Sequence, residues 1–308
     1  MEQLSLGLVG YGKIAQDQHV PAILGNPAWH LQAVATLGQP CPGVANFNSL
    51  EALLSEGPAV SAVSFCTPPQ GRYAQVRQAL LAGKHVLVEK PPCASLGEAM
   101  ALVDLAQAQG VSCLFAWHSR FAPAVEPARQ WLQGRTLRSV AITWKEDVRK
   151  WHPGQAWIWQ AGGQGVFDPG INALSIVTAL LPQPLFVSRA ELLVPANHQA
   201  PIAARLRMTD AQGLPVSADF DWDHPEPDIW RIVVETEGGV LRLEQGGAAL
   251  FIDDVAQPLP AEAEYPSLYQ HFAQLIARQA SDADLQPLRL VADAFMAGSR
   301  TLVAEFHD

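Results

Sequence analysis

The sequence predicts an α/β domain with a parallel sheet, followed by an α+β domain with an open, mostly antiparallel sheet. The chain has 308 residues, which is enough for two domains at ~150 residues each. Strands and helices alternate over residues 1–120, whereas residues 121–308 contain runs of strands joined by short turns. We therefore place the domain boundary near residue 120, and we expect the C-terminal helices to pack back towards the first domain.

The elements of the first domain follow from short apolar runs and from apolar residues at helical intervals. Strands separated by helices at this rhythm form a parallel sheet that is covered on both faces. Ser95 and Glu98 are the ends of a Ser-Leu-Gly-Glu capping box, which marks the start of a helix. The expected strands are Leu4–Val9, Leu31–Leu37, Ala59–Cys66, Lys84–Glu89 and Cys113–Trp117, and the expected helices are Ile14–Leu24, Ser49–Ser55, Tyr73–Ala82 and Ser95–Gln109.

The second domain is predicted from strands at short intervals, with turn residues such as Glu237-Gly238-Gly239 between them. Strands joined in this way form an antiparallel sheet, and the helices around it make the domain α+β. The expected strands are Val140–Glu146, Phe186–Leu193, Ile202–Asp210, Pro215–Asp221, Arg231–Thr236, Gly239–Glu244 and Ala248–Asp253, and the expected helices are Ala124–Leu132, Ile171–Leu181, Tyr265–Arg278 and Leu285–Glu305.

The composition argues against several classes of protein. Lys and Arg number 20 against 30 Asp and Glu, so the net charge is −10, and without a basic run we expect no nucleic-acid partner. The N-terminus lacks a leader pattern and no stretch is apolar enough to cross a bilayer, so we expect no membrane association. The widely spaced Cys41, Cys66, Cys93 and Cys113 form no CxxC pair. We therefore expect free thiols in a reducing cytoplasm and no metal site.

A glycine-rich turn follows the first predicted strand. Residues 10–15 read Gly-Tyr-Gly-Lys-Ile-Ala, the pattern G-x-G-x-x-A between a strand and a helix. Gly10 permits the tight turn, Gly12 lets the backbone approach a pyrophosphate, and Ala15 allows the helix to pack closely on the strand. Such a turn can also arise for steric reasons alone, but the alternating strands and helices around it favour a dinucleotide-binding Rossmann domain.

The residues at the end of the second strand select between NAD and NADP. A carboxylate there pairs with the ribose 2′-hydroxyl of NAD and repels the 2′-phosphate of NADP. The sequence has Thr36 and Leu37 at this point, and no Asp or Glu occurs from Leu31 to Leu50. No Arg is present in that stretch to hold the phosphate either. We expect NADP to be preferred and NAD to be accepted.

Two further segments resemble the signatures of the Gfo/Idh/MocA oxidoreductase family. These are Thr67-Pro68-Pro69 and Glu89-Lys90-Pro91-Pro92, and the resemblance extends over essentially the whole chain. It implies a Rossmann domain, a second domain with an open sheet, and Lys90 as the catalytic lysine. The expected cofactor contacts are Gly10, Gly12, Lys13, Ile14, Thr36, Leu37, Thr67, Pro68, Glu89, Lys90, His118 and Trp159.

The second catalytic motif of the family, a Gly-rich turn followed by D-x-G-x-H, is present with one change. Asp168 matches the aspartate of the motif, but Asn172 stands where the family has a histidine. The two residues are four apart at the start of a helix and can face one pocket. Because Asn172 cannot exchange protons near neutral pH, the acid/base role is expected to fall to Lys90, to Asp168 or to a water molecule that they hold.

The chain resembles most closely the L-arabinose/D-galactose 1-dehydrogenase subgroup of this family, through segments such as Trp117–Val125 and Trp157–Gly163. A pyranose needs polar partners for its hydroxyls and a flat apolar wall for its C–H face. The polar candidates are Glu146, Asp147, His118, His152 and Asn172, although each can also be a surface or core residue. The expected substrate contacts are Lys90, His118, Glu146, Trp151, Asp168, Asn172 and Trp230.

Tryptophan is concentrated near the predicted boundary. Of the 9 Trp in the chain, Trp117, Trp131, Trp144, Trp151, Trp157 and Trp159 fall within residues 117–159. This clustering favours an aromatic wall in a cleft between a cofactor domain and a sugar domain.

The resemblance implies NAD(P)-dependent oxidation of an aldopyranose at C1 to an aldonolactone, with L-arabinose or D-galactose as substrate. Lys90 is the first candidate for the base, and Asp168 would orient it or relay the proton. Two alternatives remain open: a family dehydrogenase or reductase for another small carbonyl compound or polyol, and a non-catalytic sugar sensor that binds the cofactor. A homodimer through the open sheet is expected by family analogy.

Overall fold

The computed structural model describes residues 3–307, and the chain folds into two compact units. One contains Met1–Trp117 and Glu264–Leu285, and the other contains His118–Ala263 and Gln286–Asp308. The first unit therefore takes in a segment from near the C-terminus. Among the described residues no helix combines the length and the apolar character needed to cross a membrane.

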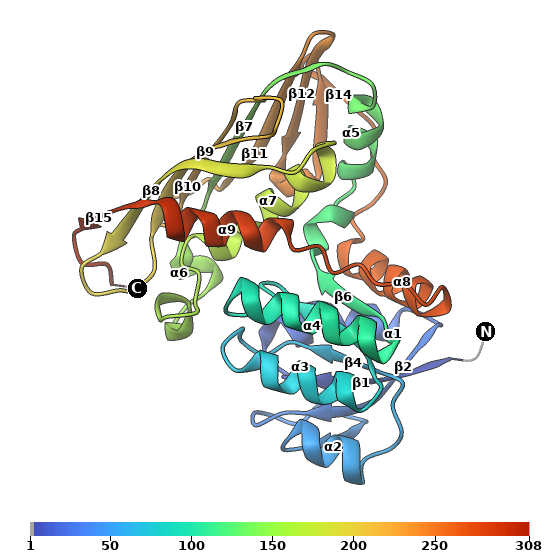
Figure 1. Ribbon diagram of the computed structural model, residues 1–308. Helices are drawn as coiled ribbons and strands as arrows, with labels where there is room; N and C mark the ends of the chain where they lie inside the picture. Colours follow the sequence, from blue (N-terminus) through green and yellow to red (C-terminus); the bar gives the residue numbers. More distant parts are fainter. Residues whose placement is uncertain (1–2, 308) are drawn as a thin grey trace. The chain divides into compact units, whose positions relative to one another are not determined.

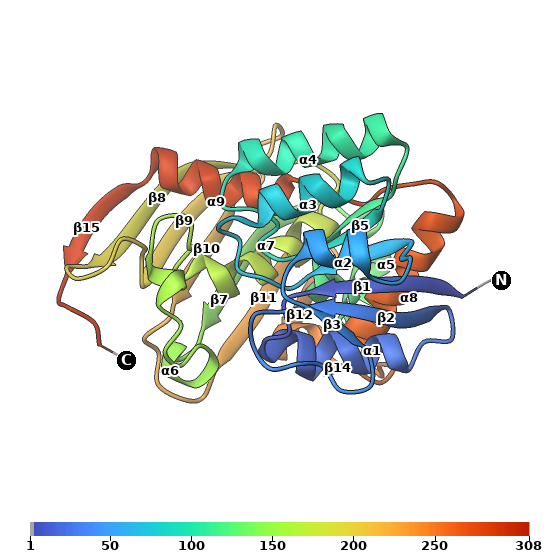
Figure 2. The same cartoon turned by 90° about the horizontal axis from the view of Figure 1, so that it is seen from below.

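The first unit is built on a parallel sheet in the strand order β3-β2-β1-β4-β5-β6 (Figure 1). This order reverses between β1 and β4, which is where open α/β sheets bind their ligands. Helices α2, α3 and α4 lie on one face of this sheet, and α1 and α8 on the other (Figure 2). The strands are β1 Leu4–Val9, β2 Trp29–Ala35, β3 Ala45–Phe47, β4 Ala62–Phe65, β5 His85–Glu89 and β6 Cys113–Ala116, and the helices are η1 Ala15–His19, α1 Val20–Leu24, α2 Leu50–Glu56, α3 Arg72–Leu81, α4 Leu96–Gln109 and α8 Glu264–Ala277.

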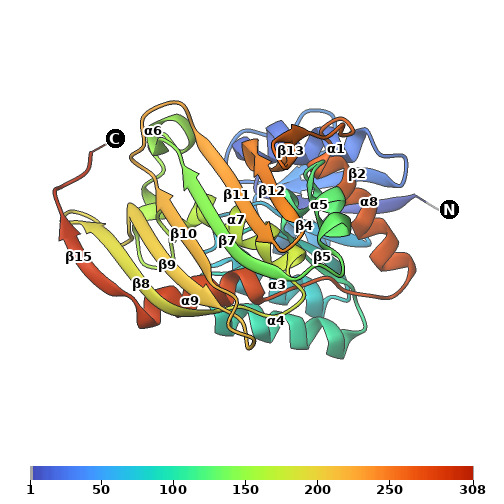
Figure 3. The ribbon, with the colours of Figure 1, turned by 90° about the horizontal axis from the view of Figure 1, so that it is seen from above.

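The second unit contains a sheet in the order β14-β13-β12-β11-β7-β10-β9-β8-β15. Its pairs are antiparallel except β7 with β10 and β8 with β15. Helices α7 and α9 cover one face, and Figure 3 looks onto the other face, where the strands lie in front of these helices. The strands are β7 Leu137–Lys145, β8 Phe186–Pro195, β9 Ala203–Thr209, β10 Val216–Asp221, β11 Ile229–Thr236, β12 Gly239–Glu244, β13 Ala249–Ile252, β14 Val255–Ala256 and β15 Ser299–Val303, and the helices are η2 His118–Phe121, α5 Val125–Leu132, α6 Val148–Trp151, η3 Ala156–Trp159, α7 Phe167–Leu180, η4 Gln245–Gly247 and α9 Gln286–Ala297.

The predicted fold classes are confirmed, and three predicted helices need correction, of which the one expected at Ile171–Leu181 already begins at Phe167. The helix expected at Leu285–Glu305 ends at Ala297, because Gly298 packs against backbone and the next five residues pair with the edge of β8 as strand β15. The helix expected at Ile14–Leu24 begins as a π-helix, in which the Val20 N–H reaches back to Ala15 O. Pro21 follows directly. A proline ring would clash with the carbonyl four residues earlier in a regular α-helix, and the wider π turn relieves this clash.

Candidate functional site

The glycine turn lies at the carboxyl ends of β1 and β4. Gly10 has a φ of +90°, and a Cβ added there would lie 3.0 Å from the backbone of Cys66 and Thr67. Only glycine fits this position, because it needs both the positive φ and the close approach. A Cβ at Gly12 would meet nothing within 4 Å, so the backbone there is open to an approaching phosphate group. The turn therefore fits a dinucleotide.

The end of β2 carries Thr36 and Leu37, as expected. The Thr36 hydroxyl accepts the N–H of Gly38, and the Leu37 side chain is 92% exposed. Lys13 forms an ion pair with Asp17 on the exterior of the π-helix, and Ile14 is exposed beside it. The β2 end itself therefore presents no anionic side chain to a 2′-phosphate.

Arg72 is a buried cation that sequence reasoning did not single out. It is 3% exposed, and its guanidinium donates to the carbonyl oxygens of Thr67, Glu89 and Pro91. A guanidinium presents five donors in a rigid planar fork, so one side chain can hold several carbonyls in place. Arg72 thereby ties the Thr-Pro-Pro segment that contains Pro68 to the segment that carries Lys90.

Glu89 is the acceptor at the centre of a buried hydrogen-bond network. Its Oε2 accepts the backbone N–H of Lys90 at 2.7 Å, and its Oε1 accepts the Tyr265 hydroxyl at 2.7 Å. His19 Nε2 lies 3.0 Å from the same Oε1, and His19 Nδ1 lies 2.8 Å from the Tyr269 hydroxyl. The network joins helix α8 to the strand end that positions the half-buried Lys90.

Burial and neighbouring groups change the proton affinities in this network. Burial alone would lower the pKa of His19, but Cys66, Tyr269 and Glu89 together raise it well above its ordinary value. Burial and the adjacent Glu89 raise the pKa of Tyr265 well above its ordinary value. Tyr265 is therefore a neutral hydrogen-bond donor to Glu89.

In the second unit, Asp168 and Asn172 lie in the first turns of α7. The helix begins at Phe167, earlier than expected, so Asp168 is inside it rather than before it. The Asp168 side chain is 3% exposed, and Asn172 follows one turn later, half-buried. The sequence-predicted spacing therefore places both residues on one stretch of helix.

Glu146 is held by two tryptophans on the face of the sheet that α7 covers. Its Oε1 accepts the Trp222 indole N–H at 3.2 Å, and its Oε2 accepts the Trp230 indole N–H at 2.8 Å. Trp230 stacks on Trp144 and contacts the half-exposed Trp151 at 5.5 Å between ring centroids. Glu146, Trp151 and Trp230 are thus brought together, as an acceptor beside an aromatic wall requires.

The remaining predicted residues have different surroundings. Trp159 is buried and stacks on His198, with ring centroids 4.5 Å apart. His118 begins the short helix η2 and is half-buried, with its Nδ1 3.4 Å from Ser119 Oγ. His152, which we considered from the sequence without selecting it, lies 3.3 Å from Asp168.

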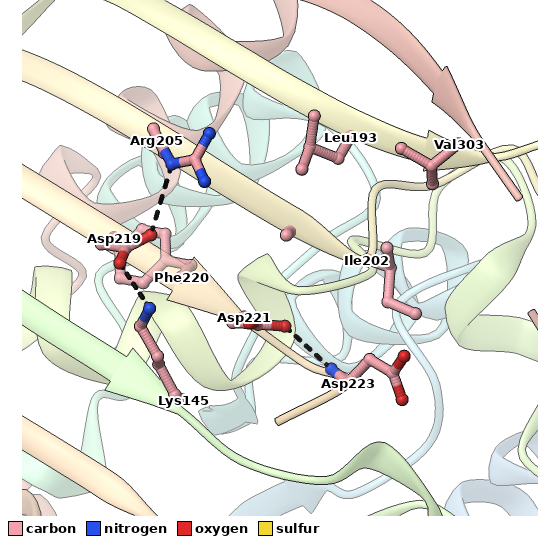
Figure 4. Close-up of a pocket in the computed structure, with 10 residues that line it drawn as sticks. Lys145, Leu193, Ile202, Arg205, Asp219, Phe220, Asp221, Asp223 and Val303 are labelled. Atoms are coloured by element: carbon pink, nitrogen blue, oxygen red, sulfur yellow. Dashed lines mark hydrogen bonds and ion pairs between the residues drawn. The ribbon is translucent and has the colours of Figure 1, made fainter. Parts of the chain in front are cut away.

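A hollow of about 250 Å³ lies on the opposite face of the same sheet (Figure 4). Lys145 and Arg205 both form ion pairs with Asp219 there, and Leu193 and Val303 form part of its apolar lining. None of the predicted cofactor or substrate residues lines it. The predicted residues of this unit that contact one another, such as Glu146 and Trp230, lie instead on the face of the sheet that α7 covers.

Comparisons with known proteins bear on the whole chain. Residues 4–116 match the family described as "Oxidoreductase family, NAD-binding Rossmann fold" under the heading GFO_IDH_MocA. The chain is 60% identical to galactose 1-dehydrogenase of Pseudomonas fluorescens over 310 residues, which covers 100% of both proteins. The chain belongs to the Gfo/Idh/MocA family of oxidoreductases. Trans-1,2-dihydrobenzene-1,2-diol dehydrogenase of Mus musculus is 31% identical over 41% of this chain and 38% of its own length.

Two solved structures share the fold of the whole chain. The crystal structure of D-galactose-1-dehydrogenase from Rhizobium etli matches with a TM-score of 0.96 and 52% identity, and covers 100% of this chain and 99% of that one. KijD10, a 3-ketoreductase from Actinomadura kijaniata, was solved in complex with NADP and TDP-benzene. It matches with a TM-score of 0.86 at 20% identity over 98% of this chain and 100% of its own, a likeness that shows the fold.

Two positions around the site, Trp222 and Arg72, were missed by sequence reasoning. Trp222 resembles any apolar residue at a strand end. Arg72 stands at the start of a helix, where a charged residue is normally exposed. The one feature of the sequence that could have pointed to Arg72 is its position five residues after Thr67, close to the Thr-Pro-Pro segment.

Proposed function

We propose that this protein oxidises an aldopyranose at C1 to the aldonolactone, with D-galactose and L-arabinose as substrates. The observation that carries the proposal is the 60% identity over the full length to galactose 1-dehydrogenase of Pseudomonas fluorescens. The two pyranoses differ at the C5 substituent, and a pocket that tolerates one hydroxymethyl group discriminates weakly between them. Both sugars are therefore expected to react.

The proposed cofactor is NADP, with NAD as a weaker substitute. The bound nicotinamide accepts the hydride that leaves C1. The open backbone at Gly12 and the turn at Gly10 are proposed to hold the pyrophosphate. The β2 end at Thr36 and Leu37 supplies neither a carboxylate nor an arginine, which supports acceptance of the 2′-phosphate without strict selection for it.

We propose that Lys90 and Asp168 are the two residues that take part in removing the proton of the anomeric hydroxyl. The anomeric hydroxyl must lose its proton as C1 is oxidised, so a general base or a cation that stabilises the developing oxyanion is required. Glu146 and Asn172 are proposed to bind sugar hydroxyls, and Trp151 and Trp230 to contact the C–H face of the sugar.

A spectrophotometric assay with NADP or NAD and a panel of aldoses tests the proposal. Reduced nicotinamide absorbs in the near ultraviolet, and D-galactose and L-arabinose are expected to give the largest signals. Lys90→Ala should lower kcat by ~10²-fold or more and leave the Kd for NADP nearly unchanged. Near-normal turnover of L-arabinose by this variant would refute the role of Lys90. Cofactor binding without oxidation of any aldose would favour the sensor.

The open face of the sheet with the hollow of Figure 4 is where we propose a homodimer contact. Leu193 and Val303 supply apolar area there, and the Lys145–Asp219 ion pair supplies polar groups. Sedimentation at several protein concentrations tests this, and a monomer at every concentration would exclude it.

A further inference from the structure

His152 and Asp168 form a polar pair in the second unit. His152 Nε2 lies 3.3 Å from Asp168 Oδ2. The side chain of Asp168 is 3% exposed and that of His152 is 21% exposed, so the carboxylate is buried while the imidazole keeps an edge to solvent. The pair therefore places a ring nitrogen of His152 against a buried carboxylate.

Gln155 and Trp157 determine which nitrogen of the His152 ring carries a hydrogen. His152 Nδ1 lies 3.3 Å from Gln155 Oε1. The Trp157 indole N–H, which can only donate, also points at Gln155 Oε1, at 3.1 Å. This oxygen is therefore the acceptor end of the Gln155 amide. His152 Nδ1 must carry a hydrogen and donate it.

With Nδ1 protonated, the contact between Nε2 and the carboxylate has two possible states. Without a hydrogen, the Nε2 lone pair of His152 meets an Asp168 carboxylate that can only accept, and the contact is repulsive. One proton between the two atoms converts the same contact into a charge-assisted hydrogen bond. We propose that His152 and Asp168 bind one shared proton, and that this pair accepts the proton of the anomeric hydroxyl during sugar oxidation.

The second part of this inference rests on the proposed function for its substrate. In the state in which His152 Nε2 carries no hydrogen, the anomeric O–H bond breaks and its proton moves to the Asp168 carboxylate, where it is shared with Nε2. The C1–H electron pair leaves as the hydride that the bound nicotinamide accepts, and C1 and its oxygen become a carbonyl group. The pair then releases the proton to solvent, which completes the cycle. His152 is a positioning residue, because it acts through Asp168.

Several charged groups near the pair have partners of their own. Glu146, at the end of β7, receives the indole N–H of Trp222, whose ring contacts that of His152 at 5.3 Å between centroids. Arg149 and Lys150, on α6, are held by acidic side chains, namely Asp147 and Asp223 for the first and Glu226 and Asp228 for the second. The positive charges of α6 are therefore locally neutralised, and the anion in contact with the imidazole is Asp168.

Nuclear magnetic resonance of protein labelled with 15N-histidine tests the shared proton without cofactor or sugar. His152→Asn assigns the ring signals of His152 by their loss. At low pH both ring nitrogens should carry hydrogens, and the hydrogen lost as pH rises should be the one on Nε2, which faces Asp168, because Gln155 Oε1 holds the one on Nδ1. At higher pH the neutral ring should keep its hydrogen on Nδ1. A neutral ring with its hydrogen on Nε2 at pH 8 would overturn the proposal.

Two substitutions of Gln155 test the link to catalysis in opposite directions. In Gln155→Leu, Nδ1 loses its acceptor and the ring can turn its hydrogen towards Asp168. The midpoint of the kcat–pH profile for sugar oxidation should then fall by about one unit. Gln155→Glu keeps the acceptor and adds a negative charge, so the midpoint should rise by a similar amount, with KM for the sugar within about twofold in both variants. Equal loss of kcat at every pH, without a shift of the midpoint, would indicate a merely structural role and overturn the proposal.

The two experiments separate the inference from the proposed function. If no aldose is oxidised, the proposed function fails, and with it the catalytic part of the inference, whereas the resonance experiment still decides the shared proton. If aldoses are oxidised but His152 carries the wrong tautomer, only the inference fails. His271 offers a matched control for the spectra, because its Nε2 contacts Asp282 at 2.9 Å in a pair whose carboxylate is 42% exposed.

Discussion

Removal of one hydroxyl group from the buried network beneath Lys90 should destabilise the first unit. In Tyr265→Phe, the hydroxyl that donates to Glu89 at 2.7 Å is lost, while the ring still fills its space in helix α8. No cavity is created, so the loss of the hydrogen bond accounts for the effect. Both residues are buried, at 4% and 3% exposure, which keeps water from replacing the lost donor.

The size of the effect follows from the charge of the acceptor. A hydrogen bond to a buried charged group contributes about 1.5–3 kcal/mol, more than a bond between neutral groups. The lower end applies here because Glu89 keeps His19 and the Lys90 N–H as donors. For a unit of this size, a loss of about 1.5 kcal/mol corresponds to a decrease in Tm of about 3–6 °C.

Differential scanning calorimetry of the full chain measures this decrease. Tyr73→Phe is the matched control, because Tyr73 is half-buried on α3 in the same unit and its hydroxyl bonds to no residue in the described range 3–307. The control is expected to change Tm by less than about 1 °C. Equal values of Tm for Tyr265→Phe and the wild-type protein would refute the role of this hydrogen bond.

Three further predictions concern pH, backbone strain and thiol reactivity. The pKa of His19 is raised in the folded state, so its stabilising contribution is complete below about pH 6.5 and is lost as pH rises through the raised pKa. In denaturant unfolding, the free energy of unfolding of His19→Asn should therefore approach that of the wild type at alkaline pH. Gly165→Ala should cost about 2–4 kcal/mol of unfolding free energy, since φ is +54° and the new Cβ would lie 2.3 Å from Pro201 O. Burial raises the pKa of Cys93 to about 12 and that of Cys113 further, so mass spectrometry should show neither alkylated at pH 8 in native protein.

Most of the fold could be predicted because its signals are local. Ser49 and Ser95 cap helices α2 and α4 as the sequence indicates, with their hydroxyls accepting the N–H groups of Ala52 and Glu98. The strand β15 could not be predicted, because what decides its conformation is the unpaired edge of β8, about a hundred residues earlier in the chain. The π-helix depends on Pro21, whose effect on the preceding turn a periodicity argument does not capture.

In the candidate site, too, the positions within motifs could be predicted from the sequence, whereas the contacts between distant residues could not. Positions defined by motifs, such as Gly10 and Asp168, lie where the motifs predict them, at a strand end and in the first turn of a helix. The partner of Asp168 was not predictable, because His152 reaches it through the chain reversal between α6 and α7. Arg72 was missed because its burial follows from three carbonyl oxygens that come together only in the folded unit.

Helix α8 belongs to the first unit but is translated long after the strands of that unit. Tyr265 and Tyr269 belong to the hydrogen-bond network of the first unit, yet the ribosome makes them after almost all of the second unit. Roughly 150 residues separate Trp117 from Glu264, which at 5–20 residues per second is a delay of about 7–30 s. During that interval the nascent chain holds Glu89 and His19 without their tyrosine partners. The first unit is thus completed late although all strands of its sheet are translated early, and a truncated chain ending at residue 117 would lack helix α8 and its two tyrosines.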